Sequence, residues 1–187
     1  MGIEFELKFR ATASALAEMR KKLPGAEQVF AMETTYYDTP QGTLSAKYYT
    51  LRRRMENETS VCTLKTPATG EGRNEFEVEC PSIEAAIPLL NKASGEALPP
   101  VVVPVCGAKF TRVAKTIVLS QCIVEVALDQ GVLSGGGREI PLCEAEVELK
   151  AGSPEAARAY ATQLALAFGL EAETKSKFRR AKDLAGT

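Results

Sequence analysis

The stretch Ile3-Glu4-Phe5-Glu6-Leu7-Lys8-Phe9-Arg10 alternates strictly between apolar and charged side chains. Because successive side chains of a β-strand point to opposite faces of a sheet, this period of two predicts a strand with one apolar face and one charged face. The apolar face can be buried in a core. The charged face needs either solvent or a polar interior, and the rest of the sequence helps to decide between them.

Charged residues at alternate positions recur in the later predicted strands. They are Arg52 and Arg54, Lys65, Arg73 with Glu75, Glu77 and Glu79, Arg112, Glu125 and Asp129, and finally Glu144, Glu146, Glu148 and Lys150. For any one strand, an ordinary solvated face is the simpler interpretation. Neighbouring strands lie about 4.8 Å apart, however, so adjacent rows of glutamates would repel one another. A sheet of this kind needs cations between its carboxylates and anions between its arginines.

The order of the predicted elements favours an antiparallel α+β fold over a doubly wound one, because strands dominate and show no βαβ rhythm. After the first strand we expect helices over 13–23, 82–94, 154–168 and 175–182, a long β-like stretch from Gly42 to Arg54, and strands near 59–66, 73–80, 109–120, 122–130 and 140–150. No boundary divides residues 1–187, so one domain is expected. If the sheet closes into a barrel with its charged faces inward, the lumen is a polar tunnel.

The composition excludes several classes of chemistry. The chain has no histidine, which excludes Ser-His-Asp triads, HExxH zinc sites and Cys2His2 fingers. Its 23 Lys and Arg nearly balance 24 Asp and Glu, which argues against a nucleic-acid-coating protein. The Walker pattern is absent, so a P-loop NTPase is disfavoured. Acid–base or metal chemistry would have to use carboxylates, lysines or water.

The cysteines and the N-terminal stretch indicate a cytoplasmic protein. Five widely spaced cysteines, none in a C-x-x-C pair, are interpreted as reduced, buried side chains: Cys62, Cys80, Cys106, Cys122 and Cys143. The first residues lack the basic start and apolar run of a secretory signal, and no stretch has 18 apolar residues. We therefore expect a soluble protein that binds no membrane. Exposed apolar strand edges would permit a homodimer.

The two kinds of charge in such a tunnel suit two kinds of ligand. Carboxylates without imidazole or an ordered thiolate set select hard cations, Mg²⁺ or Mn²⁺. Arginine and lysine supply donors for phosphate oxygens. The pattern therefore predicts a small, highly anionic, metal-bound substrate. A triphosphate fits this description better than a nucleic acid, which a narrow lumen would not admit.

Eight motifs in register resemble those of the CYTH, or triphosphate tunnel metalloenzyme, superfamily. The first is Glu4-Phe5-Glu6-Leu7-Lys8, which resembles the E-x-E-x-K signature that opens these domains. The others are Tyr36-Tyr37-Asp38-Thr39, Leu51-Arg52-Arg53-Arg54, Thr63-Leu64-Lys65, Arg73 through Glu77, Phe110-Thr111-Arg112, Ala127 through Gly131, and Cys143 through Leu149 with Ser176-Lys177. The resemblance spans the whole chain. One departure is Phe110, where the family pattern has a basic residue.

The resemblance implies an eight-stranded antiparallel tunnel that binds a triphosphate and one or two divalent metals. Phosphate oxygens would be held by Lys8, Arg52, Arg54, Lys65, Arg112 and Lys177, joined by Arg180 on the same helical face. Metals would be held by Glu4, Glu6, Glu75, Glu77, Asp129, Glu144, Glu146 and Glu148. The predicted catalytic set is Glu4, Glu6, Lys8, Arg52, Arg54 and Lys65. The pattern does not distinguish which two of Glu144, Glu146 and Glu148 bind metal directly.

Within the superfamily the chain is most similar to bacterial inorganic triphosphatases, on the stretch Ile123 to Gly131 and the C-E-x-E-x-E strand. The implied reaction is metal-dependent hydrolysis of inorganic triphosphate to phosphate and diphosphate. Alternatives are a nucleoside or thiamine triphosphatase and a class IV-type adenylyl cyclase. For these, an aromatic platform could come from Tyr36, Tyr37, Tyr48 or Tyr49, although strand tyrosines usually serve packing. A different alternative is a non-catalytic polyphosphate- or nucleotide-binding module.

Overall fold

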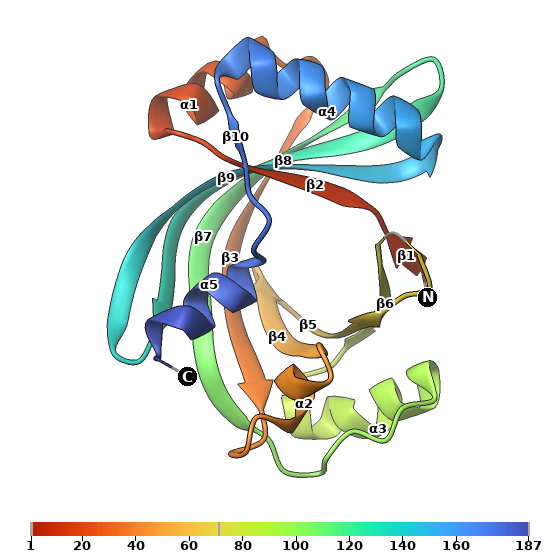
Figure 1. The fold of residues 1–187 in the computed structure, drawn as a ribbon, viewed down its shortest axis with the longest axis vertical. Coiled ribbons are helices and arrows are strands. Elements are labelled where there is room, and N and C mark those ends of the chain that lie inside the picture. Colours follow the sequence, from red (N-terminus) through yellow and green to blue (C-terminus); the bar gives the residue numbers. More distant parts are fainter. Residues whose placement is uncertain (1, 71, 187) are drawn as a thin grey trace.

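The computed structural model describes residues 2–70 and 72–186. Figure 1 shows five helices packed around one curved sheet. The strands are β1 (Gly2–Glu4), β2 (Glu6–Arg10), β3 (Glu27–Asp38), β4 (Thr50–Glu56), β5 (Thr59–Pro67), β6 (Arg73–Glu79), β7 (Val103–Val118), β8 (Cys122–Gly135), β9 (Arg138–Gly152) and β10 (Glu171–Ala172). The helices are α1 (Ala13–Lys22), α2 (Thr43–Ala46), α3 (Ile83–Ser94), α4 (Pro154–Phe168) and α5 (Lys177–Leu184).

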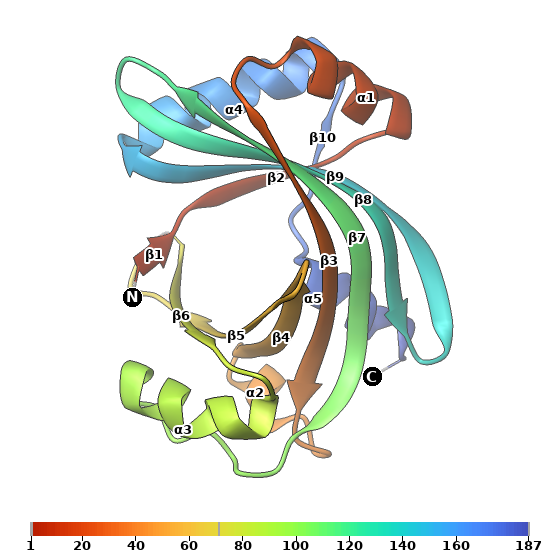
Figure 2. The ribbon, with the colours of Figure 1, turned by 180° about the vertical axis from the view of Figure 1, so that it is seen from behind.

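Every strand pairing in the sheet is antiparallel, which confirms the predicted α+β class. The strand order is β1-β6-β5-β4-β3-β7-β8-β9-β2-β10. The long strands β3, β7, β8 and β9 bend through the middle of the molecule and give the sheet a concave and a convex face (Figures 1 and 2). The concave face is the one that can enclose a site.

The sheet has ten strands among the described residues, and not the predicted eight. The first predicted strand is split at Phe5 into β1, which pairs with β6, and β2, which pairs with β9. Alternation predicts which face a side chain takes, but it does not say where a strand changes partner. Residues 2–10 thereby link the two halves of the curved sheet. The hydrogen-bonded order ends at β1 and β10, so closure into a barrel stays a prediction.

Two apolar cores hold helices against the convex face. Helices α1 and α4 pack on β2, β7, β8 and β9, around Met19, Val124 and Ala161. Helices α2 and α3 pack on β4, β5 and β6, around Leu51 and Leu90. Because these cores use the apolar side of the alternating strands, the charged side is left for the concave face.

Helix α5 forms a third core on the concave face, at the opposite end from β1. Its Ala181 packs with Phe110, Leu133 and other buried residues of β3, β7, β8 and β9. A Cβ on Gly135 would lie 2.1 Å from the Ala181 carbonyl oxygen, so only glycine permits this close approach. The absence of a side chain at Gly135 therefore lets α5 dock against β8.

The predicted helix boundaries are largely confirmed by their capping residues. Thr12, Ser82 and Ser153 each accept a hydrogen bond from a backbone N–H in the first turn of α1, α3 and α4. Gly169 adopts a left-handed conformation and ends α4. The C-terminal helix begins at Lys177 and extends to Leu184, slightly beyond the predicted segment.

The predicted stretch from Gly42 to Arg54 is not one strand, because α2 interrupts it before β4 begins at Thr50. The cause is the buried carboxylate of Asp38, which accepts hydrogen bonds from the backbone N–H groups of Thr39, Leu44 and Ser45 at 2.8, 2.8 and 3.1 Å. Alternation alone cannot reveal such a side-chain-capped turn. Pro104, which has no backbone N–H to donate, lies near the start of β7.

All five cysteines are free thiols, as predicted, but only Cys62, Cys80 and Cys122 are buried, and Cys106 and Cys143 are partly exposed. Burial raises the pKa of Cys62 to about 11 and that of Cys106 to about 12, so both stay protonated at neutral pH. Among the described residues, no helix combines the length and the apolar character needed to cross a bilayer.

The Asp38 turn yields a stability prediction. We expect Asp38→Asn to lower the free energy of unfolding by about 1–3 kcal/mol, because the amide faces several N–H donors that a carboxylate satisfies better. Urea denaturation would measure the change. Asp183→Asn is the control, since that carboxylate pairs only with the exposed Lys175 and Arg179. Equal losses in the two variants would contradict the prediction.

Candidate functional site

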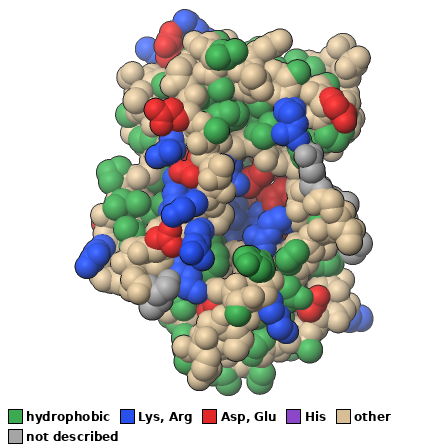
Figure 3. Space-filling model, viewed as in Figure 1, with side chains coloured by type: hydrophobic (Ala, Val, Ile, Leu, Met, Phe, Trp, Pro, Cys, Tyr) green, Lys and Arg blue, Asp and Glu red, His purple; other side chains and the backbone are tan. Residues whose placement is uncertain are grey.

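A cavity of about 340 Å³ lies on the concave face beside α5. Figure 3 shows the hollow, with basic and acidic side chains gathered in and around it. Eight acidic and eight basic residues line it: Glu4, Glu6, Glu56, Glu75, Glu77, Glu125, Glu146 and Glu148, with Lys8, Arg52, Arg54, Lys65, Arg73, Arg112, Lys150 and Lys177. The wall therefore carries many formal charges that nearly cancel.

On one wall, three glutamates lie side by side across neighbouring strands. Glu6 of β2 is opposite Glu148 of β9, which is opposite Glu125 of β8. Directly paired side chains have Cβ atoms about 5 Å apart, so these like charges repel. Lys150 offsets part of the repulsion, with its ammonium 2.9 Å from Glu148 and 3.8 Å from Glu125. Burial and the nearby carboxylates still raise the pKa of Glu148.

On the opposite wall, two carboxylates share one lysine. The Lys65 ammonium lies 2.6 and 2.5 Å from the two oxygens of Glu4, and 3.1 Å from Glu75. Arg52 reaches Glu75 at 3.4 Å. Carboxylates suited to a metal and cations suited to phosphate thus compensate one another directly across the cavity.

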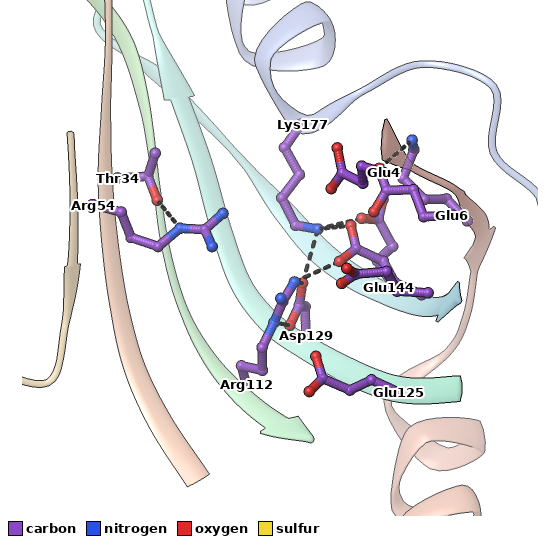
Figure 4. A network of polar contacts seen from close by, with 12 residues as sticks. Glu4, Glu6, Thr34, Arg54, Arg112, Glu125, Asp129, Glu144 and Lys177 are labelled. Atoms are coloured by element: carbon purple, nitrogen blue, oxygen red, sulfur yellow. Dashed lines mark hydrogen bonds and ion pairs between the residues drawn. The ribbon is translucent and has the colours of Figure 1, made fainter. Parts of the chain in front are cut away.

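A buried ion cluster forms the back of the cavity, where α5 meets β8 and β9 (Figure 4). The Lys177 ammonium lies 2.8 Å from Asp129 and 2.6 Å from Glu146, and it also contacts Glu144. Arg112 makes two hydrogen bonds to Asp129, at 2.8 and 2.7 Å, and one to Glu146 at 2.5 Å. Asp129 and Glu144 are completely buried.

These contacts set the protonation of the cluster. Burial alone would raise the pKa of Asp129 and Glu146, but Arg112 and Lys177 lower the pKa of both below its usual value. For Glu144 burial is the larger effect and raises the pKa to about 7. The carboxylates in turn raise the pKa of Lys177, so this lysine stays charged.

Two clusters of carboxylate residues have the chemistry to hold a hard divalent cation. Oxygens of Asp129, Glu144 and Glu146 all lie within 4.8 Å of one another, but the Lys177 ammonium is already among them. Glu4 and Glu6, in contrast, face the cavity. Only oxygen donors are present in both places, as Mg²⁺ and Mn²⁺ prefer.

Three arginines provide donors that carboxylates only partly use. The Nε atom of Arg52 is buried without a hydrogen-bond partner among the described residues. Among the described residues, Arg73 donates to neutral oxygens, those of Tyr48, Thr50 and Lys65. Burial, with Arg52 and Arg112 nearby, lowers the pKa of Arg54. This side of the cavity is therefore suited to an anion.

Most of the predicted site residues line this cavity. They are Glu4, Glu6, Lys8, Arg52, Arg54, Lys65, Glu75, Glu77, Arg112, Glu146, Glu148 and Lys177. Asp129, Glu144 and Arg180 lie behind the wall, where Arg180 contacts Glu144. Their individual roles stay predictions.

Sequence reasoning left four charged lining residues out of the predicted site: Glu56, Arg73, Glu125 and Lys150. All four lie an even number of positions from a predicted site residue on the same strand, so their side chains point to the same face. The alternation of the strands therefore could have identified them. Lys115, near Arg112 but of the opposite parity, is buried on the convex side. It donates to the carbonyls of Arg20 and Leu23 at the end of α1.

Comparison with known proteins identifies relatives of this chain. The CYTH domain family matches residues 2–181. Over 126 residues, the chain is 33% identical to an inorganic triphosphatase from Haemophilus influenzae. That match covers 64% of this chain but only 36% of the relative, so the chain spans much less than the relative's full length.

Several solved structures share the fold over nearly their whole length. A putative adenylyl cyclase from Hippeastrum, described as having a dominant triphosphatase activity, has a TM-score of 0.70 at 21% identity, covering 98% of this chain and 96% of that one. A protein from Pyrococcus horikoshii has a TM-score of 0.66 at 23% identity, covering 94% and 96%. A putative adenylate cyclase from Bacillus halodurans has a TM-score of 0.66 at 20% identity, covering 95% and 96%. At these identities the similarity concerns the fold.

The buried cluster predicts a large effect of removing its central cation. We expect Lys177→Met to lower the free energy of unfolding by about 3–5 kcal/mol, because it leaves buried carboxylates without their ammonium partner. Lys175→Met is the matched control, since the exposed Lys175 pairs only with Asp183 and should change stability little. Urea denaturation of both variants would decide. A similar small change in both would show that the cluster does not need Lys177.

Proposed function

The chain belongs to the CYTH domain family, and from that premise we propose that it hydrolyses inorganic triphosphate to phosphate and diphosphate, with Mg²⁺ or Mn²⁺ as cofactor. The single observation that carries the proposal is the cavity of eight carboxylates and eight cations. Such a wall is nearly neutral, so an anion with several charges would unbalance it unless cations entered with it. A metal-bound triphosphate satisfies that requirement.

The basic residues would bind and orient the phosphates. Arg52, Arg54 and Arg73 offer guanidinium donors on β4 and β6, Lys65 lies on β5 between them, and Arg112 lies on β7, which β3 separates from β4. Guanidinium groups match phosphate oxygens in geometry and stay charged. The predicted phosphate contacts of Lys8, Lys177 and Arg180 complete this set.

The carboxylates would hold the metal. Glu4, Glu6, Glu146 and Glu148 face the cavity, and the predicted set also includes Glu75, Glu77, Asp129 and Glu144. When bound, a divalent cation would neutralise phosphate charge and acidify a water molecule. A residue such as Lys65 would have to release Glu4 before that carboxylate could accept a metal.

The protein's own part in the reaction is mainly electrostatic. Water adds to the terminal phosphorus, the bridging P–O bond breaks, and diphosphate leaves with the bond electrons. Fixed guanidinium and ammonium groups would stabilise the charge on the transferring phosphoryl group, which is the main contribution of phosphoryl-transfer sites. This route requires neither a covalent intermediate nor a histidine.

One observation favours a second candidate, an organic triphosphate as substrate. The β3 wall of the cavity is apolar, with Phe30, Met32 and Tyr36, and Phe178 of α5 continues it. This wall could contact the nucleoside or thiamine part of a larger substrate. Of the four tyrosines considered from the sequence, only Tyr36 lines the cavity. Tyr37 and Tyr49 pack on the convex core, and Tyr48 is 79% exposed.

The main proposal predicts metal-dependent phosphate release. We expect the protein to release phosphate from inorganic triphosphate with Mg²⁺ or Mn²⁺, and Glu4→Gln or Glu6→Gln to reduce the rate about 100-fold, the scale of losing one pre-organised charged group. Glu18→Gln on the exposed face of α1 is the control. No release with either metal would contradict the proposal. Triphosphate binding without turnover would favour a polyphosphate- or nucleotide-binding module.

A substrate panel separates the enzymatic alternatives. We expect kcat/KM for inorganic triphosphate to exceed that for ATP and thiamine triphosphate, because the charged wall needs only the phosphate chain. Phosphate release and cyclic AMP formation would be measured side by side with each metal. Cyclic AMP from ATP, with inorganic triphosphate left intact, would instead support a class IV-type adenylyl cyclase. Preference for an organic triphosphate would assign the β3 wall to substrate recognition.

A further inference from the structure

Tyr36 and its sequence neighbour Tyr37 lie on opposite faces of β3. It lies on the concave side of β3, is 3% exposed and lines the cavity, and its ring centroid is 5.1 Å from that of Phe178 in α5. Tyr37 lies on the opposite side of β3 and packs against the convex core around Leu51. Two identical side chains thus have different surroundings, and only the first reaches the site.

Tyr36 and Thr34 each lie opposite an arginine of β4, but the two pairs differ in their hydrogen bonding. On the paired strand β4, Thr34 is opposite Arg54 and Tyr36 is opposite Arg52. The Thr34 hydroxyl accepts a hydrogen bond from Arg54 Nε at 3.3 Å (Figure 4). Arg52 Nε is buried without a hydrogen-bond partner among the described residues, and the Tyr36 hydroxyl is not one of the buried unpartnered atoms. The register therefore places the hydroxyl of Tyr36, a residue that lines the cavity, beside a guanidinium donor that lacks an acceptor.

The charge around Tyr36 indicates which acceptor would suit these donors. Burial raises the pKa of Tyr36, and the opposing effects of Arg52, Arg54 and Lys177 do not cancel that rise, so the hydroxyl keeps its proton. A protonated hydroxyl beside three cations can donate a hydrogen bond to an anion. Phosphate oxygens are strong acceptors that carry the charge such a place favours.

We propose that the Tyr36 hydroxyl and Arg52 Nε together bind one phosphoryl oxygen of the substrate. The identity of that substrate as a triphosphate rests on the proposed function. Tyr36 would donate its proton in a hydrogen bond without transferring it. Its ring would be held in place by Phe178, so α5 would help to position the donor.

The test compares Tyr36→Phe, which removes only the hydroxyl, with Tyr37→Phe as the matched control. Binding of a non-hydrolysable imido analogue of inorganic triphosphate is measured by calorimetry with Mg²⁺, and kcat and KM are measured with inorganic triphosphate and Mg²⁺. We expect Tyr36→Phe to weaken binding or reduce kcat/KM about 10- to 100-fold, as for a lost hydrogen bond to a charged group. Tyr37→Phe should change neither.

A second variant, at Arg52, tests the other proposed donor and keeps the proposal testable if Tyr36→Phe misfolds. Arg52→Lys keeps the positive charge but removes Nε, and should weaken triphosphate binding similarly. The fold-loss of affinity in the double variant should be smaller than the product of the fold-losses in the two single variants, because both groups bind the same oxygen. Unchanged binding and kinetics in Tyr36→Phe, or strictly multiplicative losses in the double variant, would overturn the inference.

The two proposals fail in different ways. If the wild type binds triphosphate without hydrolysing it, and Tyr36→Phe weakens that binding, the enzymatic function is wrong and the Tyr36 contact stands. If the wild type hydrolyses triphosphate and Tyr36→Phe behaves like Tyr37→Phe, the Tyr36 contact is wrong and the function stands. A lower melting temperature with unchanged binding would assign the hydroxyl a purely structural role. A wild type that neither binds nor hydrolyses triphosphate would overturn both.

Discussion

The constraint on which this structure depends is that charged residues on neighbouring strands face the same interior. The glutamates of β2, β8 and β9 cannot lie side by side without cations between them. Lys150 compensates Glu148 and Glu125. The deeper carboxylates depend on a cation from far along the chain, because α5 brings Lys177 into contact with Asp129, Glu144 and Glu146. The docked position of the last helix and the neutralisation of the buried cluster therefore depend on each other.

Such an interior is not the most stable use of these positions. Charges lose hydration when buried, and well-packed apolar residues often stabilise a protein as well as a buried ion pair does. Here the apolar sides of the strands already supply two cores on the convex face, and α5 supplies a third. Stability can come from those cores, which leaves the rest of the concave face free for a charged cavity suited to binding.

Parity along the strands predicted which face each charged residue takes, and this accounts for most of the cavity wall. Parity could not predict how deeply a side chain on that face is buried. Asp129 and Glu146 share a face, yet Asp129 lies behind the wall because α5 and Lys177 cover it. Nor could it predict the split at Phe5 or the turn made by Asp38, since both depend on partners distant in sequence or on side-chain capping. Helix ends were predicted well because their caps are local.

Tyr36 and Tyr37 show how this limit bears on function. Sequence reasoning treated the tyrosines alike, as packing residues or as an aromatic platform, whereas the sheet separates them onto opposite faces. The inner one is opposite Arg52, whose Nε has no partner among the described residues, so its hydroxyl matters as much as its ring. The same β3 wall also carries Phe30 and Met32. A substrate would therefore meet hydrogen-bond donors for its phosphates beside an apolar surface, and the relative use of the two would decide between an inorganic and an organic triphosphate.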